Sequence, residues 1–306
     1  MRQQRFNRRN MIKAGLVIAG TGTTCVKAAS VAIPDPMIPV PIPRQVPMLE
    51  GLAVLPAARL WYWDTGGTGQ PVVFLHPATG SSQIWIYQQP VFAGAGYRVI
   101  AYSRRGYYKS DPVPKENPGT ASVDLLNLLN FLRVTKCHLV GSAAGCQIAI
   151  DFALSNPGRL YSLTLACGVG GIQDPDYVKM AESIRPPGYD QMPAAFRELS
   201  PSYRAANPAG TEKWAELERA AVTGNRFGQS NANTIVWANV EKMTVPVLLI
   251  GGDSDLGVAP PMLRIFASHL KNAELVLVPE AGHSVYWEQP AFFNRTVLGF
   301  IARHAT

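Results

Sequence analysis

The sequence predicts an α/β protein built on a doubly wound, mostly parallel sheet. Short apolar runs alternate along most of the chain with segments of helical spacing, which is the pattern of repeated βαβ units. The short runs are nearly free of polar residues, as in strands covered by helices on both faces. The 306 residues are 47% hydrophobic and 16% charged, a balance that suits a large core and excludes a disordered chain.

Each predicted element rests on a local pattern. Short, mainly apolar runs of three to seven residues predict strands, and apolar residues spaced by three or four predict helices. The segment 122–132 has that helical spacing, with Ser122 in position to cap its first turn. In chain order, the sequence predicts strands at 59–64, 72–75, 98–102, 138–140, 160–166, 247–250 and 275–278, and helices at 122–132, 145–154 and 291–301.

Residues 172–240 interrupt this alternation. They are richer in Pro, Asn, Tyr and Trp, and their clearest pattern is the helical spacing of 213–222. We therefore expect a helical cap over the ends of the strands, inserted in a core formed by 50–171 and 241–306. Residues 33–49 contain six prolines, which predicts an extended linker ahead of the core.

The first 32 residues have the three regions of an export signal. A basic start is followed by the apolar stretch 14–20 and then by small residues. The pair Arg8-Arg9, followed by apolar residues and Lys13, resembles a twin-arginine signal. The sequence thus predicts a periplasmic or secreted protein. The apolar stretch is too short for a stable span, so we expect no membrane span in the mature form.

Charge and cysteine content exclude several classes of function. The net charge is +7, but six positive charges lie in residues 1–29, which contain no acid, and the remainder carries only +1. A nearly neutral domain does not indicate a nucleic-acid partner.

Three cysteines follow the signal, Cys137, Cys146 and Cys167, and an odd number of cysteines excludes a full disulfide framework. No spacing is typical of a metal or cofactor site, so no cofactor is expected, and the oligomeric state is left open.

The segment Gly141-Ser142-Ala143-Ala144-Gly145 lies between a predicted strand and a predicted helix. It resembles the nucleophile elbow of the α/β-hydrolase superfamily, in which glycines stand two residues on either side of the nucleophile. Those glycines allow strand and helix to approach closely at a strained turn. The central position is then Ala143, because a frame centred on Ser142 would put Val140 at a crowded site. A methyl group cannot attack a carbonyl, so the usual acyl-enzyme route is closed.

A second loop follows the predicted strand 72–75. His76-Pro77-Ala78-Thr79-Gly80 resembles the oxyanion loop of the same superfamily, with Pro77 in place of the usual glycine. The resemblance implies that the N–H groups of Ala78 and Ala144 form the oxyanion hole. We expect His76 to pack and hydrogen-bond within its loop rather than to take part in catalysis.

The acid and the histidine of a triad are also expected from the resemblance. Gly252-Asp253-Ser254-Asp255 follows the strand 247–250, and the family pattern favours Asp255 as the acid, with Asp253 next and Asp174 as a distant third. The loop after the last strand contains His283, in the chain order nucleophile, acid, histidine. We expect His283 and Asp255 to be hydrogen-bonded to each other.

Three accounts of Ala143 follow. In the first, Ala143 replaces a natural serine by substitution. In the second, Ala143 is native, and the His283–Asp255 pair activates water or takes a proton from the substrate. In the third, the protein only binds a small molecule. Ser142 is a candidate helper that orients a water, with helix capping as the alternative. Aromatic residues in 172–240 favour an apolar small-molecule ester or lactone as substrate. The favoured function is therefore a hydrolase, followed by a dyad lyase or other proton-transfer enzyme, and then by a binding protein.

Overall fold

The computed structural model describes residues 35–223 and 228–305. The predicted twin-arginine segment, residues 1–32, lies outside these residues, and export therefore remains a prediction. Within the described residues, no helix is long and apolar enough to cross a membrane.

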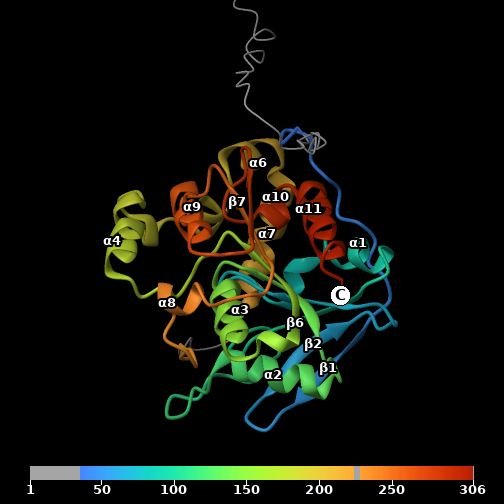
Figure 1. Ribbon diagram of the computed structural model, residues 1–306. Helices are drawn as coiled ribbons and strands as arrows, with labels where there is room; N and C mark the ends of the chain where they lie inside the picture. The colour runs from blue at the N-terminus through green and yellow to red at the C-terminus, as the bar shows by residue number, and fades with distance from the viewer. Residues whose placement is uncertain (1–34, 224–227, 306) are drawn as a thin grey trace, which may run out of the picture. The chain divides into compact units, whose positions relative to one another are not determined.

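An eight-stranded sheet forms the centre of the described chain (Figure 1). The strand order is β1-β2-β4-β3-β5-β6-β7-β8, and every strand from β3 onward pairs in parallel with its neighbours of that group. Only β2 runs antiparallel to its two neighbours. The strands are β1 Leu49–Val54, β2 Arg59–Asp64, β3 Pro71–Leu75, β4 Arg98–Tyr102, β5 Cys137–Ser142, β6 Leu160–Ala166, β7 Val247–Gly252 and β8 Ala273–Val278.

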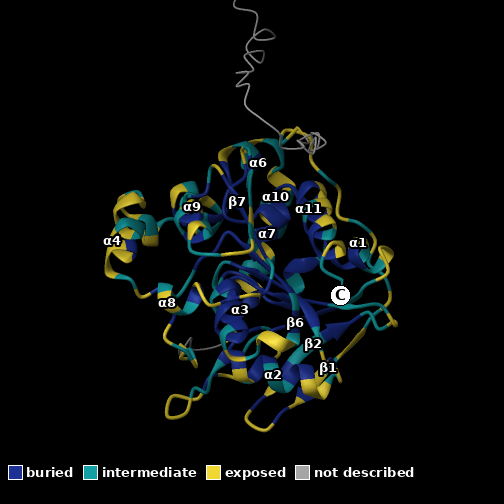
Figure 2. Cartoon of the chain, in the orientation of Figure 1, coloured by how far each residue is buried: buried dark blue, intermediate teal, exposed yellow. Residues whose placement is uncertain are grey.

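Helices cover both faces of the sheet, so the inner strands are buried on each side (Figure 2). Successive residues of β3 illustrate this: Val73 and Leu75 pack in one apolar cluster, whereas Val72 and Phe74 pack in the other. The first cluster includes residues of α2 Ala121–Phe131, α3 Ala144–Ser155 and α9 Pro260–Ser268, and the second includes residues of α1 Gln89–Gly94, α10 Val285–Glu288 and α11 Pro290–Ala302.

The predicted doubly wound architecture is confirmed, and several elements outside 172–240 were not predicted, among them β1, α1, α9 and α10. Strand β1 lies at the edge of the sheet, where Leu49, Leu52 and Val54 are exposed and only Ala53 is fully buried, so its sequence lacks the apolar run of an inner strand. Helix α1 has only six residues, and α9 begins with two prolines, which sequence patterns read as a loop.

The proline-rich residues 39–48 have no regular secondary structure, as their composition predicts, but they are bound to the core. The Gln89 side chain donates to the Val46 carbonyl and accepts from the Val46 N–H, at 2.8 and 3.0 Å. The Tyr87 hydroxyl donates to the carbonyl of Val40 at 3.0 Å. The side chain of Gln45 donates to the Ile86 carbonyl at 2.8 Å. This segment is therefore an ordered arm of the domain.

In the described part of 172–240, the regular elements are helical. The α-helices are α4 Pro175–Ile184, α5 Ala194–Glu198, α6 Pro201–Ala206, α7 Pro208–Ala221 and α8 Trp237–Val240, and a short 3-10 helix, η4, spans Tyr189–Gln191. Tyr177 of α4 and Val240 of α8 pack in the first apolar cluster, whereas Tyr203 of α6 and Trp214 of α7 pack in the second.

Candidate active site

A strained turn connects β5 to α3. Strand β5 ends at Ser142 and α3 begins at Ala144, so Ala143 alone makes the reversal. Its φ of 48° and ψ of −113° lie outside the regions that alanine prefers. Such a conformation costs about 1–3 kcal/mol and is typical of active sites. The strained geometry of an elbow is thus present although residue 143 has no nucleophilic atom.

The two flanking glycines are required by contact between backbones. A Cβ atom on Gly141 would lie 2.8 Å from the carbonyl carbon and oxygen of Gly145. A Cβ atom on Gly145 would lie 2.3 Å from the carbonyl oxygen of Leu75 on β3. Both approaches are far shorter than ordinary carbon contacts, so any side chain at either position would push α3 away from the sheet. The frame centred on Ala143 is therefore the one that fits the backbone.

His283 and Asp255 are hydrogen-bonded, as the sequence predicts. The Nδ1 atom of His283 lies 2.9 and 2.8 Å from the two carboxylate oxygens of Asp255. Oδ1 of Asp255 also accepts the N–H groups of Gly257 and Val258, at 2.7 and 2.9 Å, which fixes the carboxylate. The two side chains come from loops after β7 and β8, whose carboxyl ends lie together because these strands are parallel. The bond at Nδ1 leaves Nε2 of His283 for chemistry in the cavity.

The charges around His283 favour its protonated form. Burial by itself lowers the pKa of this histidine, but the negative charges of Asp255 and Glu198, with the Asp255 hydrogen bond, outweigh burial and raise the pKa to about 9. His283 is only 8% exposed and Asp255 only 4%. The acidic side chains around His283 thus stabilise its imidazolium.

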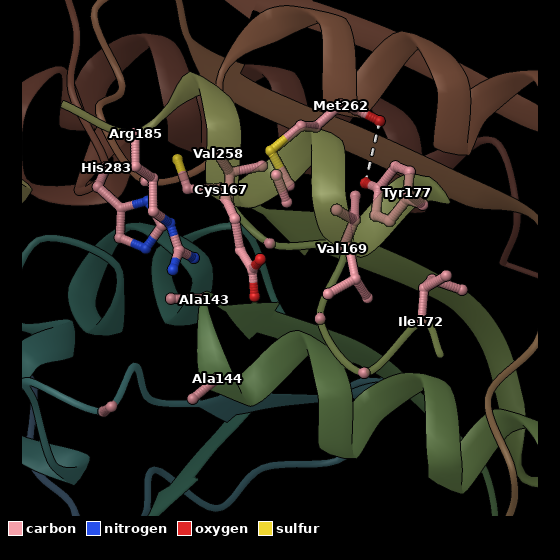
Figure 3. A pocket seen from close by; sticks show the side chains of 18 of the residues that line it. Ala143, Ala144, Cys167, Val169, Ile172, Tyr177, Arg185, Val258, Met262 and His283 are labelled. Carbon is pink, nitrogen blue, oxygen red and sulfur yellow. Dashed lines mark hydrogen bonds between the residues drawn. The ribbon is translucent and has the colours of Figure 1, made fainter. Parts of the chain in front are cut away.

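A cavity of about 390 Å³ joins the turn at Ala143 to helix α4. Figure 3 shows Ala143 and His283 toward one end of it and Ile172 and Tyr177 toward the other. The Tyr177 hydroxyl donates to the Met262 carbonyl at 3.2 Å, and this bond holds the Tyr177 ring in the wall of the cavity. Most of the lining is apolar, and the charged or polar side chains among the lining residues are Glu182, Arg185, Tyr189, Glu198 and His283.

Both predicted oxyanion donors lie in this lining. Ala78 and Ala144 flank the turn at Ala143. Ala144 is the first residue of α3, so its N–H has no acceptor one turn earlier in the helix. The dipole of α3 adds a partial positive charge at the same point. This arrangement can stabilise a negative oxygen beside Ala143.

The other two candidate acids do not reach His283. Asp253 is exposed, and its Oδ1 accepts the Glu280 N–H at 2.7 Å, so this carboxylate orders the turn between β7 and the histidine loop. Asp174 caps α4 by accepting the Tyr177 N–H at 2.9 Å. The acid assignment therefore stays with Asp255.

The helper role considered for Ser142 is wrong. This residue ends β5, is fully buried and is absent from the cavity lining. Side chains alternate along a strand, so Ser142 is turned away from the space beside Ala143. It does not cap α3 either, because the first turn of that helix has no side-chain cap.

His76 is a structural residue, as expected. It is fully buried, and its Nδ1 lies 2.7 Å from the Pro77 carbonyl oxygen. Its Nε2 accepts the backbone N–H of Arg104 at 3.1 Å, which ties the oxyanion loop to the loop after β4.

Two buried glutamates near His283 were not found by sequence reasoning. Glu288 accepts the N–H groups of Ser200, Gly282 and Ser284, at 2.8–3.3 Å, and so holds both sides of the histidine. Burial raises the pKa of Glu288 to about 7. Glu198 lines the cavity itself. Glu198 ends a helix of only five residues, and such a short segment has no sequence pattern that distinguishes a buried Glu from a surface one.

The three cysteines Cys137, Cys146 and Cys167 are buried free thiols. Cys167 lines the cavity near Ala143 and is the one thiol placed to meet a ligand. Burial and the charge of Asp255 raise the pKa of Cys167 well above its ordinary value. A thiol held in its neutral form is a poor nucleophile, so Cys167 does not substitute for a serine.

A family model described as the alpha/beta hydrolase family matches residues 72–296, about three quarters of the chain. The chain belongs to this family. One relative, from Dechloromonas aromatica, is named 2-hydroxy-6-oxononadienedioate/2-hydroxy-6-oxononatrienedioate hydrolase 1. It is 30% identical to this chain, and the alignment covers 79% of this chain and 90% of the relative. The protein thus belongs to a family of enzymes, and several of its relatives are named as hydrolases.

Two solved structures show the same fold. A thermophilic esterase from Thermogutta terrifontis aligns with a TM-score of 0.68 and 23% identity, covering 84% of this chain and all of the esterase chain. The enol-lactonase from Burkholderia xenovorans LB400 aligns with a TM-score of 0.66 and 21% identity, covering 82% of this chain and all of the lactonase chain.

Proposed function

We propose that this α/β hydrolase cleaves a small or medium-sized, largely apolar ester or lactone, and that water activated at the His283–Asp255 pair replaces the serine nucleophile. The observation that carries the proposal is the hydrogen-bonded pair of His283 and Asp255 in a cavity that also contains the strained turn at Ala143. A side chain without a hydroxyl leaves room for a water molecule where a serine oxygen would stand.

The geometry suits attack on a carbonyl carbon. A carbonyl oxygen placed between the N–H groups of Ala78 and Ala144 would present its carbon to the space between Ala143 and His283. Negative charge develops on that oxygen during attack, and both the N–H groups and the dipole of α3 stabilise it. Proton transfer takes place at Nε2 of His283, because Nδ1 is bonded to Asp255.

The substrate class follows from the size and lining of the cavity. A volume of about 390 Å³ is in the range of pockets that take small organic molecules. The walls supplied by Val169, Ile172, Val258 and Met262 favour an apolar acyl or ring portion. The similar structures include proteins named as an esterase and an enol-lactonase, which supports esters and lactones as the first substrates to try.

The test is turnover of para-nitrophenyl acetate, para-nitrophenyl butyrate and δ-valerolactone by the purified protein. We expect hydrolysis by the parent and, on δ-valerolactone, a loss of about 10²–10⁴-fold in His283→Ala, the usual contribution of a positioned proton-transfer group. His269→Ala, half-buried and outside the cavity, is the control and should leave the rate unchanged. Hydrolysis of δ-valerolactone that survives in His283→Ala would remove the proposed function. Binding or proton exchange of these compounds without hydrolysis would favour the lyase-type or binding alternatives.

A further inference from the structure

The last residue of helix α5, Glu198, is fixed directly against the histidine loop. Its backbone carbonyl accepts the N–H of Ser284 at 3.1 Å, and its Oε2 lies 3.4 Å from the Ser284 hydroxyl, which donates to it. On the other side, a Cβ atom on Gly282 would lie 2.9 Å from the Glu198 carbonyl oxygen. The two segments are thus in backbone contact on both sides of His283. These contacts hold Glu198 in a fixed position relative to the histidine.

The carboxylate of Glu198 is buried without a basic partner. The residue is only 8% exposed, yet its side chain lines the cavity. Within residues 35–223 and 228–305, it forms no salt bridge with a lysine or arginine. Burying a carboxylate costs several kcal/mol unless it is paired and hydrogen-bonded. The positive charge of His283, the Thr79 side chain and the charge of Arg197 favour the ionised form of Glu198, whereas burial and the charge of Asp255 oppose it.

Glu198 and His283 influence each other's charge. The negative charge of Glu198 helps to raise the pKa of His283, and burial raises the pKa of Glu198 while the positive charge of His283 opposes this. A carboxylate whose pKa is raised is a better proton acceptor than one with an ordinary pKa. The other charged or titratable groups that face this pair are Asp255, Glu288, Arg197, Tyr189, Tyr286 and Cys167.

We propose that Glu198 is a second catalytic residue, which accepts a proton from the attacking water while the imidazolium of His283 donates a proton to the leaving oxygen. This proposal rests on the ester or lactone hydrolysis proposed above, and it replaces His283 by Glu198 as the group that takes the water proton, so that the base and the acid are different side chains. Asp255 then stabilises and orients the imidazolium.

The proton balance closes within the site. The water oxygen forms a bond to the carbonyl carbon, and Glu198 takes one water proton as the carbonyl electrons move to the oxyanion. When the tetrahedral intermediate collapses, the bond to the leaving oxygen breaks and that oxygen takes the Nε2 proton of His283. Return of the proton from Glu198 to His283 restores the starting state, and the net reaction is addition of one water to the ester.

The central test compares Glu198→Gln with Glu116→Gln. Both changes remove one negative charge, but Glu116 is exposed and lies outside the cavity. We expect kcat for δ-valerolactone and para-nitrophenyl butyrate to fall about a hundredfold or more in Glu198→Gln and to change little in Glu116→Gln. Glu198→Asp should restore part of the rate. A Glu198→Gln variant with parental kcat on both compounds would overturn the proposal.

The leaving group separates the two roles. Nitrophenolate leaves without needing a proton, whereas the alkoxide of a lactone needs one. His283→Gln should therefore lose far more rate on δ-valerolactone than on para-nitrophenyl butyrate, while Glu198→Gln should lose similar amounts on both. If His283→Gln instead loses the same rate on both compounds and Glu198→Gln keeps its activity, His283 is the base. The proposed ester hydrolysis would then stand without the role of Glu198. A parent without activity on either compound would overturn both proposals.

The pH dependence of kcat/KM and the thermal stability distinguish a catalytic Glu198 from a purely structural one. If His283 is the acid, kcat/KM for δ-valerolactone falls above about pH 9, where the imidazolium is lost; if it is the base, the rate rises up to that pH. Glu198→Gln removes a buried charge but also the attraction between that charge and the His283 imidazolium, so we expect only a small change in Tm. A rate that rises to pH 9, or a lower Tm with unchanged kcat, would contradict the assignment.

Discussion

A Cβ atom on Gly257 would lie 2.6 Å from the hydroxyl of Tyr189, so the turn that holds Asp255 is in contact with the segment 172–240. The same Cβ would lie 3.3 Å from Nδ1 of His283 and 3.4 Å from Oδ1 of Asp255. These contacts leave no room for a methyl group beside the hydrogen bond of the pair. The spacing of this pair therefore depends on a glycine two residues from the acid.

Gly257→Ala is expected to reduce activity more than stability. The added methyl group should displace Tyr189 and lengthen the bond between His283 and Asp255, lowering kcat/KM for para-nitrophenyl butyrate about tenfold or more. Gly94→Ala is the matched control, because a Cβ there meets no atom within 4 Å and alanine favours the helix. Equal rates in the two variants, measured beside their Tm values, would show that the pair tolerates the methyl group.

Ala143→Ser should create a covalent route. The turn already has the strained backbone that presents a nucleophile, and a hydroxyl on residue 143 would enter the cavity shared with His283. We expect stoichiometric labelling at residue 143 by a serine-directed phosphonate, found by mass spectrometry, and faster release of nitrophenolate from para-nitrophenyl acetate. Ser142 serves as an internal control because it is buried away from the cavity. Absence of label at 143 in the folded variant would mean that the turn is not competent as an elbow.

The raised pKa of His283 predicts a pH dependence of stability. A histidine whose pKa is about 9 in the folded protein and about 6.5 unfolded stabilises the fold fully below pH 6.5, and loses that contribution as the pH rises through 9. The free energy of unfolding of the parent should therefore fall more between pH 7 and 10 than that of His283→Gln. Parallel curves for the two proteins in chemical denaturation would show that His283 is not held protonated.

Export by the twin-arginine route is tested on the signal itself. Changing Arg8 and Arg9 together to lysine keeps the charge but removes the paired guanidinium groups, so the precursor should accumulate in the cytoplasm. Arg2 and Arg5 changed to lysine give a control with the same loss of two guanidinium groups. Periplasmic yield that matches the parent in the Arg8/Arg9 variant would exclude this route.

Sequence patterns identified the parts of the site that depend on backbone geometry. Gly141 and Gly145 are required wherever strand and helix meet this closely, and Asp255 and His283 occupy loops whose order along the chain follows from the fold. The same patterns missed Glu198, because its role depends on where a five-residue helix packs rather than on any local spacing. Burial, which distinguishes it from exposed Glu182, is visible only in three dimensions.

The ordered arm at residues 39–48 changes where the folding unit begins. Similarity to the family covers residues from 72 onward, yet β1, β2 and this arm precede that point. A protein shortened to the region of similarity would leave β4 with an unpaired edge, where β2 normally hydrogen-bonds, and would uncover Gln89, whose amide is satisfied by Val46. Exposed strand edges promote association between chains. Such a fragment is expected to aggregate, so recombinant work should retain every residue from the arm onward.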